Sequence, residues 1–289
     1  MTVSPTLLIL ISAVLHAGWN ALLKSAKNKG ATSLCVLAVA GLLSVFVAVA
    51  THSPWLPLSN PDILPWVIAA GLFEGLYFYT LARALTLSPL GPVYTVIRGG
   101  AMLLVWAVSI PLLGERITAH AATGALLVLL GVPLLSPPPS RPGGKLDPAQ
   151  LRGLQFALIS AVCVAGYHLS YGQALTHSAT PAPLFAMAMV LAVLLQALLL
   201  DMTPIRALKL ATAGRADIIK LLTAGSICAG AFLLFLYGLS RSGPGITISL
   251  RNTSILFAQL FALFMGERMN RRQWLGVLLS AAGAALLTL

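Results

Sequence analysis

The chain has 289 residues, of which 58% are hydrophobic and only 9% are charged, and its mean hydropathy is +0.92. This composition excludes a soluble globular protein and indicates one whose surface faces lipid. The formal net charge of +11 does not indicate a nucleic-acid partner, because we expect the basic residues to lie between membrane spans.

Ten apolar segments are long enough to cross a bilayer as helices, since a span needs about 20 residues. They predict an all-α integral membrane protein with ten transmembrane helices. The segments cover residues 5–23, 32–51, 63–85, 92–113, 119–136, 153–173, 182–200, 217–239, 245–265 and 272–288. A short stretch between the seventh and eighth segments, Pro204 to Leu210, is expected to lie at the membrane interface.

The first segment carries one polar stripe, because Ser12, His16, Asn20 and Lys24 follow one another at four-residue spacing. Such a stripe faces protein or water rather than lipid. His16 and Asn20 either line a binding site or hydrogen-bond to neighbouring helices. Lys24 stands at the end of the segment and is expected to act as an orientation charge.

Three ionisable residues lie deep within the third, fourth and ninth segments: Glu74, Arg98 and Arg251. Charges at this depth cost several kcal/mol unless they are paired or hydrated, so they indicate function. The arginines either bind a carboxylate or phosphate of a substrate or pair with Glu74 and backbone carbonyls. Glu74 is either their counter-ion or a carboxyl that carries a coupling proton.

Aromatic and polar residues near these positions are further candidates for a substrate site. Trp19 and Tyr167 occupy similar places near the start of each half, and their rings either wall a cavity or pack helices together. The candidates for substrate binding are Arg251, Arg98, Asn252, Thr253, His16, Asn20, Trp19, Tyr77, Tyr167 and His168. No catalytic residue, metal site or cofactor is expected, and the cysteines Cys35, Cys163 and Cys228 lack metal or redox spacing.

The sequence repeats itself. Gly91-Pro92 and Gly114-Glu115-Arg116 recur 152 residues later as Gly243-Pro244 and Gly266-Glu267-Arg268. We predict two five-helix repeats at 1–136 and 152–289, joined by a linker at 137–151. An odd number of spans inverts the second repeat relative to the first.

The repeated motifs also predict local structure. Proline in a first helical turn costs no hydrogen bond, so Gly91-Pro92 and Gly243-Pro244 predict tight hairpins whose flanking helices pack as close pairs. Glu115 and Glu267 stand at helix ends and are expected to serve as caps.

Loop charges set the predicted orientation. Counted by alternate loops, only Arg116 and Arg241 fall on one side, and fourteen basic residues fall on the other. These are Lys24, Lys27, Lys29, Arg83, Arg141, Lys145, Arg152, Arg206, Lys209, Arg215, Lys220, Arg268, Arg271 and Arg272. The positive-inside rule makes the second side cytoplasmic and places both termini outside.

These motifs resemble the drug/metabolite transporter superfamily, EamA type. The resemblance rests on the Gly-Glu-Arg motifs, on His16-Ala17-Gly18-Trp19-Asn20 with Lys24, on residues 93–99 and on residues 250–254. It implies a transporter of ten helices in two repeats and favours export.

The expected function is therefore secondary active transport of a small anionic or zwitterionic metabolite across the inner membrane. Alternating access would move it, by proton-coupled or facilitative export. The alternative is an integral membrane enzyme or a flippase that acts on a lipid-linked substrate. The expected partners are a small-molecule substrate, the lipid bilayer and protons, with no nucleic acid, and the chain is a monomer or a homodimer.

Overall fold

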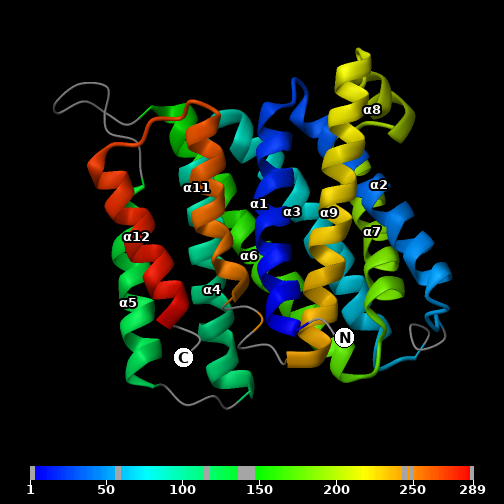
Figure 1. The fold of residues 1–289 in the computed structure, drawn as a ribbon, viewed down its shortest axis with the longest axis horizontal. Helices are drawn as coiled ribbons and strands as arrows, with labels where there is room; N and C mark the ends of the chain where they lie inside the picture. The colour runs from blue at the N-terminus through cyan, green and yellow to red at the C-terminus, as the bar shows by residue number, and fades with distance from the viewer. Residues whose placement is uncertain are drawn as a thin grey trace.

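The computed structural model describes residues 4–55, 60–113, 118–135, 147–242, 247 and 250–286, and all regular structure in these residues is helical. Most helices stand side by side in one bundle (Figure 1). They are α1 Pro5–Ser25, α2 Lys29–Ala50, α3 Leu64–Leu87, α4 Leu90–Leu113, α5 Ala119–Leu134, α6 Pro148–Thr176, α7 Pro181–Leu199, α8 Pro204–Ala211, α9 Arg215–Ser242, α11 Ser254–Phe264 and α12 Arg271–Leu286.

Proline and short polar residues mark the starts of these helices. A proline stands in the first turn of α1, α3, α6, α7 and α8, where its missing N–H leaves no hydrogen bond unmade. The side chains of Asn28 and Asp147 accept hydrogen bonds from the backbone N–H groups of Ala31 and Ala149. These caps stabilise the starts of the helices and fix the residues at which they begin, which hydropathy alone does not define.

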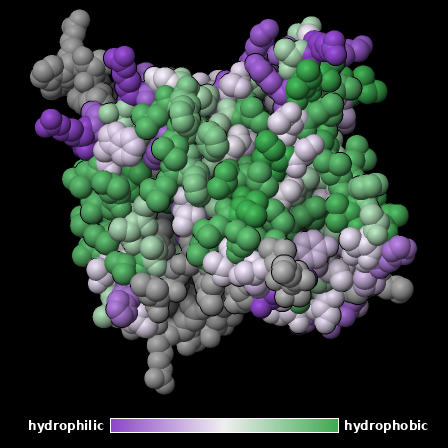
Figure 2. Space-filling model, viewed as in Figure 1, coloured by the Kyte–Doolittle hydropathy of each residue, from purple (hydrophilic) through white to green (hydrophobic). Residues whose placement is uncertain are grey.

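Seven helices in the described residues are long and apolar enough to span a membrane: α1, α2, α3, α4, α6, α7 and α9. Two shorter apolar helices cover Ala122–Leu134 and Leu250–Phe264. On the face shown in Figure 2, a belt of hydrophobic side chains covers the middle of the bundle, between more hydrophilic ends. Leu42, Phe46 and Phe264 are 71%, 68% and 85% exposed, which is unfavourable in water and favourable in lipid.

The predicted close packing of the third and fourth segments is wrong. Their helices, α3 and α4, make few contacts with each other, because each packs mainly on α6, which lies between them (Figure 1). Likewise α1 packs on both α9 and α11. Proline keeps the α3–α4 connection short, but the helices diverge because their apolar faces bury more surface against the other half of the chain.

Helix contacts made by the first half of the chain have counterparts in which the corresponding helices of the second half take the same places. The contact of α6 with α3 and α4 corresponds to that of α1 with α9 and α11, and α3 meets α7 as α9 meets α2. Helix α1 begins at the end of the bundle where α6 finishes (Figure 1).

Glycines bring α5 and α12 into close contact. A Cβ atom on Gly131 would lie 2.8 Å from the carbonyl oxygen of Gly276, and one on Gly283 would lie 2.6 Å from that of Gly124. Only glycine permits backbones to approach so closely.

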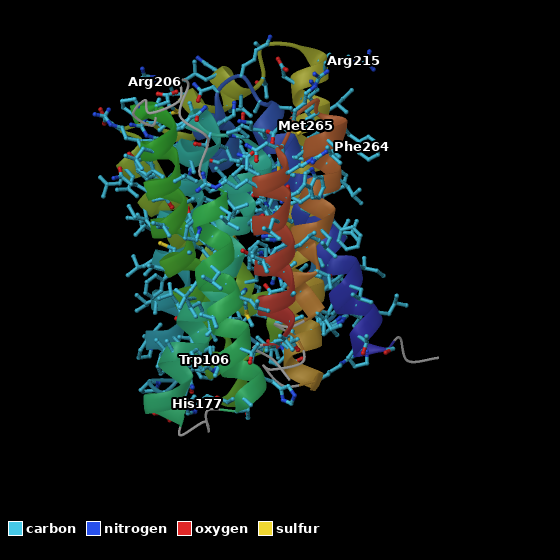
Figure 3. All side chains as sticks on the ribbon, turned by 90° about the vertical axis from the view of Figure 1, so that its left-hand side faces the viewer. Trp106, His177, Arg206, Arg215, Phe264 and Met265 are labelled. Atoms are coloured by element: carbon cyan, nitrogen blue, oxygen red, sulfur yellow. The ribbon has the colours of Figure 1, made fainter. Side chains whose placement is uncertain are left out.

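Basic side chains gather at one end of the bundle, which we call the basic end. It comprises the α1–α2 connection, α8 and the starts of α6, α9 and α12. Arg206 and Arg215 lie there, whereas His177 lies at the opposite end (Figure 3). Arg241 is the basic residue that the described part of the chain places at the opposite end, and Arg116, Arg141 and Lys145 lie outside the described residues.

Candidate functional site

The three ionisable residues predicted at membrane depth lie inside the bundle. Glu74 on α3 and Arg251, in the helical turn before α11, are 0% exposed, and Arg98 on α4 is 2% exposed. None of them faces the lipid. Buried charges of this kind require compensation from neighbouring groups.

Arg251 is held by one imidazole and two aromatic rings. Its Nη2 atom lies 3.1 Å from Nδ1 of His16, and its Cζ lies 3.8 Å and 4.9 Å from the ring centroids of Phe235 and Phe232 on α9. Cation–π contacts stabilise a desolvated guanidinium by about 2 kcal/mol. Among the described residues its Nε and Nη1 atoms have no hydrogen-bond partner, so two donors remain for another ligand.

His16 joins α1 to this arginine. Its Nδ1 also accepts a hydrogen bond from Nε1 of Trp19, at 3.3 Å. Arginine and tryptophan side chains only donate, so Nδ1 acts as the acceptor and the ring proton sits on Nε2. Asn20 donates to the backbone oxygen of His16 at 2.7 Å, and its own Oδ1 has no partner.

Arg98 is linked to the same group of rings through Tyr94. Its Cζ is 5.8 Å from the ring centroid of Tyr94, and that ring is 6.1 Å from the ring of His16. The Nη2 atom of Arg98 has no hydrogen-bond partner. In the sequence Arg98 lies six residues after Pro92, whereas Arg251 lies seven residues after Pro244. Despite this shift of one residue, both arginines reach the surroundings of His16.

Glu74 does not form a direct ion pair with an arginine, which was one of its two expected roles. In the described residues no carboxylate oxygen of Glu74 lies within 4.0 Å of Arg98 or Arg251. Its Oε1 accepts a hydrogen bond from the hydroxyl of Tyr171 at 3.2 Å, and its Oε2 has no partner. Tyr171 on α6 fills the position next to Glu74 that an arginine was expected to take.

Aromatic rings connect Glu74 to the arginines. Tyr167 on α6 packs on Tyr77, Tyr171 and Phe232 at centroid distances of 5.7, 5.9 and 5.8 Å. His168 lies edge-on to Tyr167 at 4.7 Å and packs on Phe235 at 5.0 Å. On α1, Trp19 stacks on Phe78 at 4.9 Å. We call this group of rings, with Glu74, Arg98, Arg251 and His16, the central cluster.

The two polar residues that follow Arg251, Asn252 and Thr253, differ in their hydrogen bonding. Asn252 is 5% exposed and its Nδ2 has no hydrogen-bond partner. Thr253 is only partly buried, and its hydroxyl donates to the carbonyl of Leu250 at 2.7 Å. The structure therefore leaves Asn252 available to a ligand and uses the hydroxyl of Thr253 in its own turn.

Sequence reasoning left several members of the central cluster out of the candidate set. Phe232 and Phe235 hold Arg251, Tyr171 binds Glu74, and Tyr94 faces Arg98. The three-residue spacing of Phe232 and Phe235 placed them on one helix face, but aromatic residues in an apolar helix ordinarily indicate packing.

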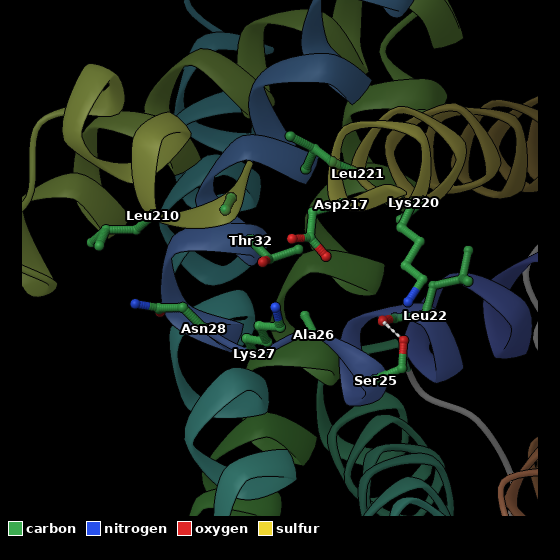
Figure 4. A pocket seen from close by; sticks show the side chains of 12 residues that line it. Leu22, Ser25, Ala26, Lys27, Asn28, Thr32, Leu210, Asp217, Lys220 and Leu221 are labelled. Carbon is green, nitrogen blue, oxygen red and sulfur yellow. Dashed lines mark hydrogen bonds between the residues drawn. The ribbon is translucent and has the colours of Figure 1, made fainter. Parts of the chain in front are cut away.

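A small hollow lies apart from the central cluster, at the basic end. It is lined by the α1–α2 connection and by residues of α2, α8 and α9, including Thr32 on α2 and Asp217 and Lys220 on α9 (Figure 4). Ser25 donates to the carbonyl of Leu22 at 2.7 Å within this lining. None of the predicted site residues lines it.

Apolar helices packed around buried charges define an α-helical membrane protein that crosses the bilayer several times. The model of the EamA-like transporter family matches residues 151–289. The second half of the chain is therefore similar to EamA-like transporters, which belong to the drug/metabolite transporter superfamily.

A solved chain described as "Crystal structure of protein" has a similar fold, with a TM-score of 0.67. It is 20% identical, and the match covers 99% of this chain and 96% of that one. At this identity the likeness shows the fold alone. The sequence matches no curated protein.

Proposed function

We propose that this protein is a secondary transporter that binds a small metabolite with an anionic group in the central cluster. The observation that carries the proposal is that both buried arginines have guanidinium nitrogens without a hydrogen-bond partner in the described part of the chain: Nε and Nη1 of Arg251 and Nη2 of Arg98. A buried N–H without a partner costs about 1–3 kcal/mol. A carboxylate or phosphate oxygen would recover that free energy.

The cluster has two poles, which favours a zwitterionic substrate within the anionic class. In the described part of the chain, Arg251 and Asn252 present unpartnered donors at one pole, and His168 adds an unpartnered ring nitrogen. Glu74 presents an unpartnered carboxylate oxygen at the other, among the rings of Tyr77, Tyr167 and Tyr171. A cationic group there would meet both a carboxylate and aromatic ring faces.

Alternating access between two inverted five-helix repeats would move the substrate. The exchange-symmetric helix contacts and the opposite directions of α1 and α6 support this arrangement. In it α5, α11 and α12 also cross the membrane, which completes ten spans, and the central cluster lies between the repeats. The basic end faces the cytoplasm of an inner membrane, with both termini outside.

Glu74 is the candidate for proton coupling, and export is the favoured direction. A carboxyl bound by a single tyrosine, with one oxygen unpartnered, can exchange a proton without breaking an ion pair.

Transport by purified protein in proteoliposomes tests the proposal. A thermal-shift screen of small carboxylates, zwitterions and phosphate monoesters identifies a ligand, and the radiolabelled ligand is then used for uptake. We expect Arg251→Ala to weaken binding about 10- to 100-fold, because it removes charge-assisted hydrogen bonds. Arg251→Lys recovers only part of the affinity, since an ammonium cannot reproduce the guanidinium fork.

Arg272→Ala is the matched control, because Arg272 is an exposed arginine at the basic end and lies outside the central cluster. It should bind and transport like the unmodified protein. Binding within about twofold of normal in a folded Arg251→Ala variant would remove the central cluster as the anion site.

A further inference from the structure

The connection between α7 and α9 at the basic end contains a helix of its own. α8 begins at Pro204, where the hydroxyl of Thr203 accepts a hydrogen bond from the N–H of Arg206 at 3.3 Å. It has eight residues, and so short a helix is not stable alone in water. Contact with α2 buries Ala207 and Ala211, which are 0% and 9% exposed.

The face of α8 turned away from α2 carries large apolar side chains. Ile205 and Leu208 are 71% and 49% exposed, and their three-residue spacing places them on one side of the helix. Ile219 and Leu222, in the first turns of α9, are 57% and 51% exposed. In Figure 2 the hydrophobic belt of the bundle continues upward to the region of α8. Water contact would be unfavourable for these side chains.

Basic side chains flank this apolar surface. Arg206 and Lys209 on α8, with Arg215 and Lys220 at the start of α9, are all exposed. Between residues 200 and 222 the acidic residues are Asp201 and Asp217, and Asp217 lines the hollow of Figure 4. A positive rim beside an apolar face complements a surface that is negative outside and apolar beneath.

We propose that α8 and the first turns of α9 form a docking surface for anionic phospholipids of the leaflet at the basic end. Ile205 and Leu208 enter the boundary between headgroups and acyl chains, while Arg206 and Lys209 bind the phosphate groups. Each basic side chain close to such a surface contributes roughly fivefold to the preference for anionic lipid. The bound lipid holds α8 against α2 and so supports the connection between α7 and α9.

The apolar residues distinguish a membrane from a free anion. Inorganic phosphate would satisfy Arg206 and Lys209 but leave Ile205 and Leu208 in water, whereas a phospholipid satisfies both kinds of side chain. The exposed hydrophobic belt of the spans must itself contact lipid. Attachment of α8 to the bilayer extends that lipid contact to the basic end.

A fluorescent probe on α8 in the full-length protein tests this surface. Leu208→Cys is labelled with an environment-sensitive thiol dye, since the native cysteines Cys35, Cys163 and Cys228 are 7%, 1% and 0% exposed. The protein is reconstituted in phosphatidylcholine alone or with about one third phosphatidylglycerol. Quenching by phosphatidylcholine with brominated chains reports the depth of the probe. A probe at Ala213→Cys, an exposed position beyond α8, gives the reference for water.

We expect strong quenching at Leu208→Cys, a further increase with phosphatidylglycerol, and little quenching at Ala213→Cys. Neutralising α8 with Arg206→Gln and Lys209→Gln should reduce the phosphatidylglycerol effect at least about fivefold. Arg271→Gln with Arg272→Gln removes the same charge at the same end and should leave the effect intact.

Quenching at Leu208→Cys no greater than at Ala213→Cys would overturn the proposal. So would an equal loss of the phosphatidylglycerol effect in the Arg271/Arg272 variant, because the effect would then report charge in general. Reproduction of the effect in neutral vesicles by inorganic phosphate would overturn it as well.

Discussion

His16 connects the charged residues of the central cluster more directly than any ion pair does. Its Nδ1 meets Arg251 and Trp19, and its ring packs on Tyr94, which in turn faces Arg98. A neutral imidazole orients a guanidinium without neutralising it, so the positive charge of Arg251 remains available to a substrate. The sequence stripe on α1 thus places the residue that positions the proposed anion site.

Glu74 gives the prediction that belongs to the scale of a single residue. If its carboxyl carries the coupling proton, Glu74→Gln should abolish the pH dependence of transport, because an amide resembles the protonated carboxyl but cannot release a proton. The measurement is the initial rate of uptake of the identified ligand across a pH series, with and without an imposed pH gradient.

Asp62→Asn provides the control, since Asp62 is an exposed carboxylate outside the central cluster. Its pH profile should match that of the unmodified protein. A Glu74→Gln variant that still transports with an unchanged pH profile would assign the proton to another group or show transport without a proton.

At the scale of elements, the turn between α3 and α4 is fixed by two charges from elsewhere in the chain. The carboxylate of Glu267 accepts hydrogen bonds from the N–H groups of Leu90 and Gly91 at 2.7 and 3.1 Å. The ammonium of Lys24 donates to the carbonyls of Leu85 and Ser88 at 2.8 and 2.7 Å. An anion thus meets the start of α4 and a cation the end of α3, as the helix dipoles favour.

This arrangement confirms the predicted capping role of Glu267 and extends it, because the helix that Glu267 caps belongs to the other half of the chain. Glu115 lies outside the described residues. Lys24 was expected to serve only orientation, yet it also binds the end of α3. Together Lys24 and Glu267 hold the α3–α4 turn in place around Leu90, which is 0% exposed and so does not contact solvent at the basic end.

Removing the carboxylate of Glu267 should therefore open the basic end. In Glu267→Ala, we expect a cysteine placed at Leu90 to react with a water-soluble thiol reagent about tenfold faster than in the parent Leu90→Cys protein. The reason is that two hydrogen bonds to a charged group, each contributing about 1.5–3 kcal/mol, are lost from the closed form. The labelling rate in detergent or nanodiscs measures the change.

Asp62→Asn in the same Leu90→Cys background is the control for loss of a negative charge and should label at the parent rate. Equal rates for Glu267→Ala and the parent would show that Glu267 caps α4 without controlling access to the basic end.

At the scale of the whole molecule, hydropathy and charge predicted the helices because a bilayer imposes a strong requirement on each span separately. The helices lie close to the predicted segments, and Glu74, Arg98 and Arg251 are buried as expected. The insertion of α6 between α3 and α4 could not be predicted, because hydropathy does not determine which apolar helix faces pack against each other. Nor could the bond from Tyr171 to Glu74, which depends on side-chain directions across two halves.

The orientation of the bundle is the prediction that concerns the molecule as a whole. Basic residues gather at the end that carries α8. Membrane proteins tend to insert with their Lys- and Arg-rich loops on the cytoplasmic side. Ala213 and His177 are exposed and lie near α8 and at the opposite end, respectively. We expect His177→Cys to react with a membrane-impermeant thiol reagent in intact cells, and Ala213→Cys to react only after the membrane is permeabilised.

The unmodified protein supplies the blank, because its cysteines are buried, and labelling of both variants after permeabilisation shows that each site is accessible. The opposite pattern would place the basic end outside. The substrate would then meet the end held by Lys24 and Glu267 from the external side, and the expected direction of transport would have to be reconsidered. The anionic lipids proposed to bind α8 would also have to come from the outer leaflet, so this measurement constrains the transport direction and the lipid surface together.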